Sequence, residues 1–450
     1  SIILCYLFKR LKVINKKIIY LIFFLSGLSG LIYELLWSRY LKNFLGHSAY
    51  AQSLVLCIFM GGMAIGSYLA SKLSSKIKKP LIIYGIIEGI IGCFALSFHY
   101  IFNYITSISY NYVFNWIENS FGIIVYKIII SSLIITPQTI LLGMTFPIIS
   151  YFFVRDNYED TGKNVALLYF FNSIGAAFGV FVTGFYFVEN FGMPLTMIIG
   201  GIINLSIFFF VVFNSKKMKS SESVFVKTVE RENKKIFMVL YLIAFFTAFS
   251  SFIYEIVWIR MLSLVLGSST HNFEIMLCAF ITGLAFGGLY IRLKAGSIKN
   301  PLSYLSGVQI LMGISAISTL PFYNITFNII SYLINNLPKN DFGYYLYNLS
   351  SHLISFAIML PATFFAGMTF PLIIFVMKQE GMGEKSIGNV LAINTLGGIL
   401  GIIFAVHIGF PYFGLKNLLF LGSAIDIALG LGIILILNVS LKPAFSPCRS

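Results

Sequence analysis

The chain has 450 residues, of which 58% are hydrophobic and only 10% are Asp, Glu, Lys or Arg. Soluble domains carry about 25% charged residues, so a soluble enzyme, a nucleic-acid-binding module and a disordered chain are all excluded. A transmembrane β-barrel is excluded as well, because its strands alternate polar and apolar residues whereas this chain has long unbroken apolar runs. The composition therefore predicts an all-α integral membrane protein whose main partner is the lipid bilayer.

Apolar runs mark the membrane-crossing helices, since a helix needs about 20 apolar residues to span a bilayer. Six runs come first, at 18–33, 43–71, 80–117, 128–154, 164–188 and 190–215. Six more follow a charge-dense stretch, at 236–254, 275–291, 300–338, 342–377, 386–415 and 415–441. We predict an N-terminal segment, a first six-helix repeat, a linker, a second six-helix repeat and a tail, at 1–17, 18–213, 214–235, 236–441 and 442–450.

The basic residues predict the orientation, since Lys and Arg accumulate on the cytoplasmic side of a membrane protein. The net charge is +15, from 31 basic and 16 acidic residues. With both termini and the linker 214–235 in the cytoplasm, 25 of the 31 basic residues lie inside. We therefore predict a multi-pass protein of the cytoplasmic membrane, with both termini facing the cytoplasm.

The two six-helix units are copies of one repeat. The pattern YExxWxR occurs at 33–39 and again at 254–260, and GMTFP occurs at 143–147 and again at 367–371. The copies are separated by an even number of spans, so they point the same way across the membrane. Parallel six-helix repeats predict a major-facilitator-like architecture of about 12 transmembrane helices.

Four GxxxG pairs recur at matching places in the two repeats. Glycine lets helix backbones approach closely in lipid, where packing replaces the hydrophobic driving force. We predict that these pairs are packing seams between helices: Gly62 and Gly66, Gly175 and Gly179, Gly283 and Gly287, and Gly397 and Gly401.

Two prolines lie deep in corresponding helices, each four residues after a glycine: Pro147 after Gly143, and Pro371 after Gly367. Proline removes a backbone hydrogen bond and crowds the carbonyl four residues back, so each helix should bend and free a carbonyl group. Two interpretations remain open for these positions: a static bend, and a hinge or polar site that lines a cavity.

Ionisable residues inside spans are the strongest pointers to a site, because each costs about 2.5–3.5 kcal/mol at a helix centre. In the YExxWxR motif, the Trp fits the interfacial aromatic belt and the Arg can extend outward to water. The plain interpretation is an anchor with an interhelical Glu–Arg pair. The functional ones are a gate or clamp, in which Glu34 meets Arg260 and Glu255 meets Arg39, and a direct solute contact. The motif supplies these candidates for substrate binding or gating: Tyr33, Glu34, Trp37, Arg39, Tyr254, Glu255, Trp258 and Arg260.

Two further carboxylates, Glu88 and Asp426, lie deeper in their spans, and their repeat counterparts are the neutral Gln309 and Asn204. A charge kept in only one repeat suggests an asymmetric ligand, so we expect Glu88 and Asp426 to face a shared central cavity, with Gln309 as a further candidate. Acidic residues outnumber basic ones inside the spans by five to two, which favours a cationic or proton-coupled solute. One of the five, Glu274, is most simply a water-exposed helix end. No Cys or His spacing indicates a metal site, and no cofactor is predicted.

The quoted motifs resemble a known family. SGLSGLIYELLWSRYLKNFLGHS at 26–48, SSFIYEIVWIRMLSLVLGSS at 250–269, GMTFP, and NSIGAAFG with NTLGGILG are similar to the membrane region of fused spermidine-synthase-like proteins. In that family a major-facilitator-like domain precedes a cytoplasmic polyamine aminopropyltransferase domain. The resemblance covers about 21–437 and implies a polyamine solute and an aminopropyltransferase domain or subunit as partner.

This chain departs from the family at its end. Nothing like the enzyme's Gly-rich nucleotide-binding loop follows residue 441, so no catalytic residue is assigned. Enzymatic activity stays open, because the chain is either a fragment of a longer protein or a membrane half that stands alone. Three functions remain open. The first is a transporter that moves a small cationic solute, such as a polyamine, by alternating access. The second is a membrane scaffold for an aminopropyltransferase, and the third is a lipid- or glycan-handling protein.

Overall fold

The computed structural model describes residues 16–46, 48–156, 158, 160–214, 234–267, 270–381 and 383–440. Within these ranges the chain forms twelve long helices and no strand. The first half contains α2 (Lys16–Leu45), α3 (Ser48–Leu73), α4 (Pro80–Asn111), α5 (Ser120–Asp156), α6 (Thr161–Val182) and α7 (Val188–Asn214). The second half contains α8 (Lys234–Leu266), α9 (Thr270–Lys294), α10 (Pro301–Asn336), α11 (Asp341–Gln379), α12 (Lys385–Phe404) and α13 (Gly414–Ser440). The predicted N-terminal segment, linker and tail fall almost wholly outside the described residues.

The helices are long and apolar enough to cross a membrane. Ten continuous helical stretches of the described chain meet this condition, and two of them, Thr161–Asn214 and Lys385–Ile436, each contain two helices. These are α6 with α7 and α12 with α13, so the described part makes about twelve crossings. The prediction of an all-α, multi-pass membrane protein is confirmed.

The two double helices are built alike. A π-helical segment joins α6 to α7 at Thr183–Phe187, and another joins α12 to α13 at Ala405–Phe413. Each is followed by a kink at a glycine with a left-handed backbone, Gly192 (φ 68°) and Gly414 (φ 69°). Only glycine adopts this conformation without strain, so the chain turns sharply at the same place in both halves.

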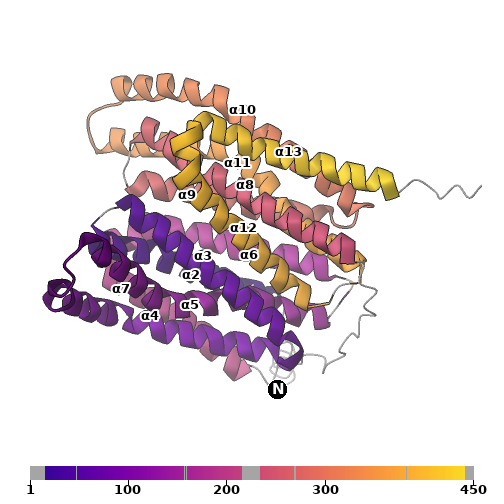
Figure 1. Ribbon diagram of the computed structural model, residues 1–450, viewed down its shortest axis with the longest axis horizontal. Coiled ribbons are helices and arrows are strands. Elements are labelled where there is room, and N and C mark those ends of the chain that lie inside the picture. Colours follow the sequence, from indigo (N-terminus) through magenta and orange to yellow (C-terminus); the bar gives the residue numbers. More distant parts are fainter. Residues whose placement is uncertain are drawn as a thin grey trace, which may run out of the picture.

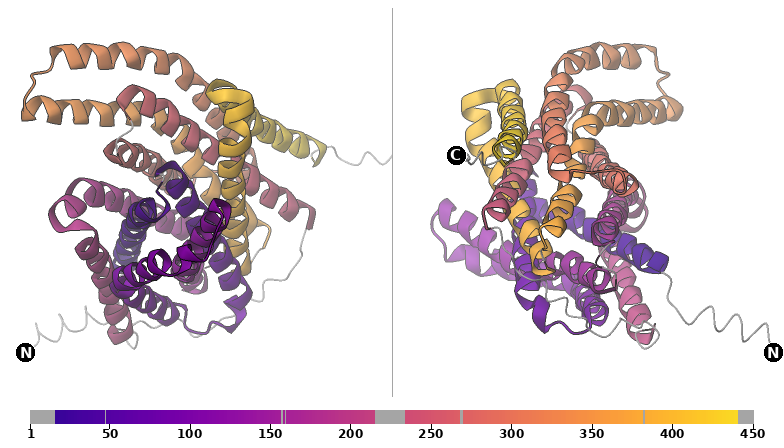
Figure 2. Two further views of the ribbon diagram at one scale, coloured as in Figure 1. Left: turned by 60° about the vertical axis from the view of Figure 1, so that its left-hand side comes forward. Right: turned by 90° about the vertical axis from the view of Figure 1, so that its right-hand side faces the viewer.

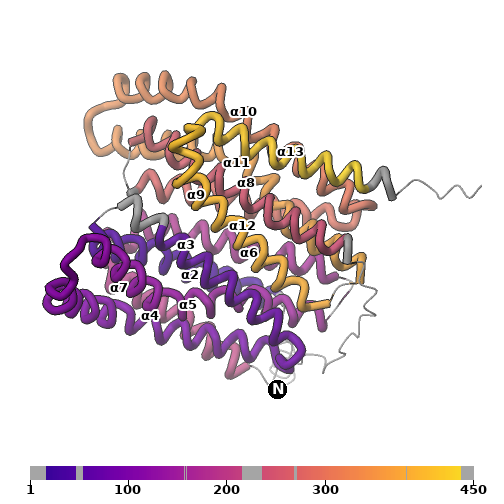
Figure 3. Tube along the Cα trace, viewed as in Figure 1, coloured from indigo at the N-terminus to yellow at the C-terminus, as the bar shows by residue number. Residues whose placement is uncertain are grey.

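The helices of the two halves pack in the same order. In the first half α2 packs on α6, α3 on α5 and α4 on α7, and in the second α8 packs on α12, α9 on α11 and α10 on α13. The halves meet where α6 contacts α9 and where α3 contacts α12. Figures 1 and 3 show the first half, indigo to magenta, beside the second, which runs through orange to yellow, and the two views in Figure 2 agree. This matches the prediction of two parallel repeats.

The predicted glycine seams are close helix contacts. A methyl group at Gly66 of α3 would collide with the Ile140 carbonyl of α5, and one at Gly287 of α9 would collide with the Phe364 carbonyl of α11. On the facing side, Gly143 lies directly against the main chain of Met63. These helices therefore pack backbone to backbone, as expected where small residues replace a hydrophobic driving force.

Candidate functional site

A cavity of about 810 Å³ lies between the two halves, at the end of the molecule where α2 and α8 terminate. We call the end of the molecule where α2 and α8 terminate the open end. The last turns of α2 and α8 form much of its wall, and α3, α9 and α13 contribute further side chains. Lys42 and Arg260 on the wall are exposed, so the cavity reaches the surface. Its volume is within the range of about 300–1,000 Å³ usual for small-molecule sites.

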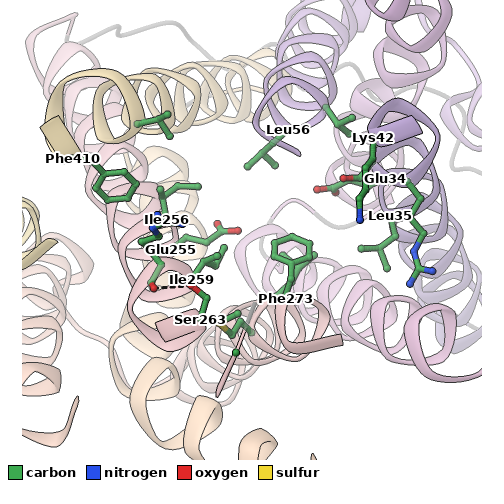
Figure 4. A pocket seen from close by; sticks show the side chains of 18 of the residues that line it. Glu34, Leu35, Lys42, Leu56, Glu255, Ile256, Ile259, Ser263, Phe273 and Phe410 are labelled. Carbon is green, nitrogen blue, oxygen red and sulfur yellow. Dashed lines mark hydrogen bonds between the residues drawn. The ribbon is translucent and has the colours of Figure 1, made fainter. Parts of the chain in front are cut away.

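Glu34 and Glu255 are the carboxylates that line this cavity. They occupy the same place in the two repeats, and Figure 4 shows them pointing into the cavity from opposite sides. Glu255 is only 3% exposed, and neither carboxylate has a hydrogen-bond or ion-pair partner in the described part of the chain. Both carboxylates face the same cavity, so they repel each other when both are ionised, and a positive charge placed between them would be attracted by both.

The predicted pairing of these carboxylates with the motif arginines is wrong. Arg39 instead donates a 2.5 Å hydrogen bond to Glu274 of α9, and the two form an ion pair across the halves. Glu274 is fully buried and is not a water-exposed helix end as expected. It offers Arg39 a nearer partner than Glu255, which leaves both cavity carboxylates unpaired.

The tyrosines of the YExxWxR motif face the interior of their own halves. The Tyr33 hydroxyl donates a hydrogen bond to Asn204 of α7, and the Tyr254 hydroxyl donates one of 2.6 Å to Asp426 of α13. Successive helix residues are about 100° apart, so Tyr and Glu neighbours project from different faces. The motif thus ties each helix to its own bundle with Tyr and presents Glu to the cavity.

The motif tryptophans are also interior, and their predicted place in the interfacial belt is wrong. Trp37 is fully buried and stacks on Tyr33. The Trp258 Nε1–H donates a hydrogen bond of 3.2 Å to Thr319 Oγ1, so its polar atom is satisfied within the protein. The hydrophobic contacts of both rings keep the Tyr–Glu segments of α2 and α8 in place.

Glu88 and Asp426 do not line the cavity, which corrects the expectation of a shared cation site. Glu88 accepts a 2.6 Å hydrogen bond from Ser26 and another from Asn204, all inside the first half. Asp426 accepts a 2.6 Å bond from Ser250 in the second half, in addition to that from Tyr254. The carboxylates avoid lipid as predicted, but hydroxyl and amide groups surround them instead of a cavity.

Each half has one buried acid and one buried amide at equivalent positions, but the helix that carries the acid differs between the halves. In the first half the acid, Glu88, is on α4 and the amide, Asn204, is on α7, whereas in the second half Gln309 is on α10 and Asp426 is on α13. Gln309 donates a hydrogen bond of 2.5 Å to Thr247 of α8. The three candidates Glu88, Gln309 and Asp426 therefore hold helices together within a half.

The opposite end of the interface, which we call the closed end, is held by an ion pair between the halves. Arg155 of α5 makes two hydrogen bonds of 2.7 Å to Glu384, the residue before α12, and only 6% of its side chain is exposed. Its other N–H groups donate to the carbonyls of Ser74 and Ile77. From the sequence, Arg155 is only one of the 25 basic residues predicted to face the cytoplasm. Its role follows from the folding of α12 against α3, which no local pattern reveals.

Hydroxyl contacts reinforce the closed end. Ser71 of α3 donates hydrogen bonds of 2.7 Å to the Lys385 carbonyl and 2.6 Å to Asn389 Oδ1, both of α12. The two halves are thus bonded at this end, whereas the cavity lies between them at the other end.

The four predicted hinge residues lie in continuous helices, since α5 runs through Pro147 and α11 through Pro371. The carbonyl of Gly143, which Pro147 cannot bond, accepts a 2.9 Å hydrogen bond from Ser67 of α3. In the second half Gly288 stands in place of Ser67, so the sequence supplies no equivalent hydroxyl there. A static bend and a hinge both stay hypotheses for Pro147 and Pro371.

No group of His, Cys, Asp and Glu in the described ranges has the arrangement of a metal site. The sequence matches no protein-family model, and no curated protein matches it either.

Solved structures do match. The human organic anion transporter MFSD10 (TETRAN) superposes with a TM-score of 0.57 at 11% identity, over 93% of this chain and 100% of its own. The major facilitator superfamily proton:xylose symporter XylE, bound to 6-bromo-6-deoxy-D-glucose, superposes with a TM-score of 0.56 at 14% identity, over 94% of this chain and 96% of its own. The fold is that of the major facilitators. The link to spermidine-synthase-like proteins gains no support from these structures and rests on the sequence motifs.

Proposed function

We propose that this protein is a transporter, which moves a small organic solute with a cationic group across the membrane by alternating access. The observation that carries the proposal is the cavity itself. It lies between two halves, holds two unpartnered carboxylates, Glu34 and Glu255, and opens at the end opposite to the Arg155–Glu384 pair, which joins the halves.

The geometry suggests how the solute would drive the change. A cationic group between Glu34 and Glu255 cancels their repulsion and attracts both halves, so it favours the state in which the open end closes. The Arg155–Glu384 pair must then separate for the solute to leave at the other end. The backbone-to-backbone seams inside each half keep each bundle rigid during this movement.

We further propose that the closed end faces the cytoplasm in the cytoplasmic membrane, as the distribution of basic residues predicts. The resemblance to fused spermidine-synthase-like proteins makes a polyamine the first solute to test and an aminopropyltransferase a candidate partner. The expected boundaries of the two repeats, 18–213 and 236–441, belong to the same proposal.

Uptake by purified protein in liposomes tests the proposal, with a panel of labelled amines that includes spermidine and ω-amino acids. We expect at least one amine to accumulate, and the Glu34→Gln/Glu255→Gln double variant to lose about tenfold or more in uptake, because it removes both charge-assisted contacts. Glu118→Gln is the matched control, since Glu118 is exposed and outside the cavity. Full uptake by the double variant would refute the role of the carboxylates, and no uptake of any amine by the wild type would favour the scaffold.

A further inference from the structure

The cavity walls carry positive charges that the proposed function does not use. Arg39 and Arg260 are equivalent in the two repeats, and both line the cavity. Arg39 is neutralised by the buried Glu274, and only 23% of its side chain is exposed. Ser53 stands in the first repeat where Glu274 stands in the second, so the sequence supplies no equivalent acid for Arg260. Arg260 is exposed, and none of the described carboxylates forms an ion pair with it.

Lys42 is the second uncompensated charge. It is exposed in the cavity wall, it has no ion-pair partner in the described part of the chain, and its repeat counterpart is the neutral Ser263. Lys42 lies in the last turn of α2, where a cation also favours the helix dipole. That explanation does not extend to Arg260, which precedes the end of α8 at Leu266 by more than one turn.

The positive and negative groups lie at different depths. Lys42 follows Glu34 by eight residues and Arg260 follows Glu255 by five, which corresponds to about 12 Å and 7.5 Å along the helix axes. The carboxylates therefore form the deeper level and the cations the level nearer the open end. Apolar side chains lie around the carboxylates, among them Ile256, Phe273 and Phe410 (Figure 4).

We infer that the solute carries an anionic group in addition to its cationic group, and that Arg260 and Lys42 receive the anionic end while Glu34 and Glu255 receive the cationic end. This inference rests on the proposed function, which supplies the cationic contact. A solute with positive charges alone must pass two uncompensated cations in a low-dielectric cleft, which repels it. A zwitterion with an apolar spacer meets an opposite charge at both levels and apolar side chains between them.

Three probes with the same carbon chain test the inference: 8-aminooctanoate, 1,8-diaminooctane and octanoate. Binding to the purified full-length protein is measured by calorimetry. We expect 8-aminooctanoate to bind about tenfold more tightly than either single-charge-type probe, because only it makes charge-assisted contacts at both levels. In the Lys42→Gln/Arg260→Gln variant, the preference for 8-aminooctanoate over 1,8-diaminooctane should disappear. Lys339→Gln, which removes an exposed cation outside the cavity, should keep it.

The outcomes separate this inference from the proposed function. If 1,8-diaminooctane binds the wild type at least as tightly as 8-aminooctanoate, the anionic group is refuted and the cationic site stands. If octanoate binds most tightly, the cationic site is refuted and the contact with Arg260 and Lys42 stands. The assignment to Lys42 and Arg260 is refuted if the Lys339→Gln variant loses the preference for 8-aminooctanoate over 1,8-diaminooctane. It is also refuted if the Lys42→Gln/Arg260→Gln variant keeps that preference. No binding of any probe refutes both proposals.

Discussion

The two halves of this protein have the same backbone plan but different charges. Both contain the tyrosine that bonds across its own bundle, the glycine seams and the left-handed glycine kink. Among the described residues, two charged contacts between the halves have no counterpart in the repeat: Arg39 bonds Glu274 while no described acid bonds Arg260, and Arg155 bonds Glu384 while its counterpart is the neutral Gln379. A methyl group at a seam glycine would meet the main chain of the facing helix, which explains why these glycines recur in both halves. Charges can diverge wherever a duplicated scaffold serves an asymmetric ligand or movement.

The largest expected effect comes from breaking the contact at the closed end. Arg155→Gln leaves Glu384 and two carbonyl groups without their partner, and loss of one member of a buried ion pair costs about 3–5 kcal/mol. Since Glu384 is 21% exposed, we expect about 3 kcal/mol of unfolding free energy to be lost. A cysteine at the buried Ser386 should also react faster with maleimide. Thermal denaturation and labelling rates provide the measurements.

Asp160→Asn is the control for that change. It removes the Lys163–Asp160 pair, whose side chains are 37% and 46% exposed, so the effect should stay below about 0.5 kcal/mol. If the two variants melt at the same temperature, the Arg155–Glu384 pair does not hold the halves together.

Alanine substitutions at the glycine seams should lower the stability less, and by equal amounts in the two halves. Gly143→Ala places a methyl group against the Met63 main chain, and Gly367→Ala places one against that of Leu284. Overpacking costs about 1–3 kcal/mol, so both melting temperatures should fall by similar amounts. Gly307→Ala should raise the melting temperature slightly, since a methyl group at Gly307 meets nothing within 4 Å and Ala favours the helix. Unequal effects of the first two variants would show that the halves are not packed alike.

The smallest loss of stability should come from exchanging the acid Glu88 and the amide Asn204. Asn204→Asp puts a second carboxyl group beside Glu88 in a buried site, which should cost about 1–2 kcal/mol. Adding Glu88→Gln recreates the arrangement of Gln309 and Asp426 and should recover most of that stability. The measurement is a double-mutant cycle in melting temperature, together with affinity for the solute, which should stay unchanged. A double variant as unstable as the sum of its parts would contradict the exchange.

The fold was predictable because the sequence patterns that specify it extend over many residues. Apolar runs of membrane length and motif copies at a fixed offset specify helices and their order without any knowledge of contacts. Glu34 and Glu255 were candidates for the same reason, since they are paired acids in equivalent spans.

The hydrogen-bond and ion-pair partners of the ionisable side chains were not predictable. The cost of burying a charge shows only that the charged group avoids lipid. That cost does not show whether the charged group faces a cavity or is surrounded by polar side chains. Glu88 and Asp426 are surrounded by Ser, Tyr and Asn side chains. Hydropathy likewise cannot separate an interfacial Trp from the buried Trp37. Arg39 pairs with Glu274 and not with Glu255 because α2 and α9 both pack on α6, which becomes apparent only once the helices are placed.

The ion pair of Arg39 and Glu274 has a mechanical consequence. Close to it, His271 of α9 lies 3.5 Å from Glu189 of α7, so the same edge of the open end has two polar links between the halves. No such link joins the other edge, between α3 and α12, among the described side chains at that end. In the proposed movement that closes the cavity, these two links should restrain the edge at α2, α7 and α9, so the halves should rotate about that edge.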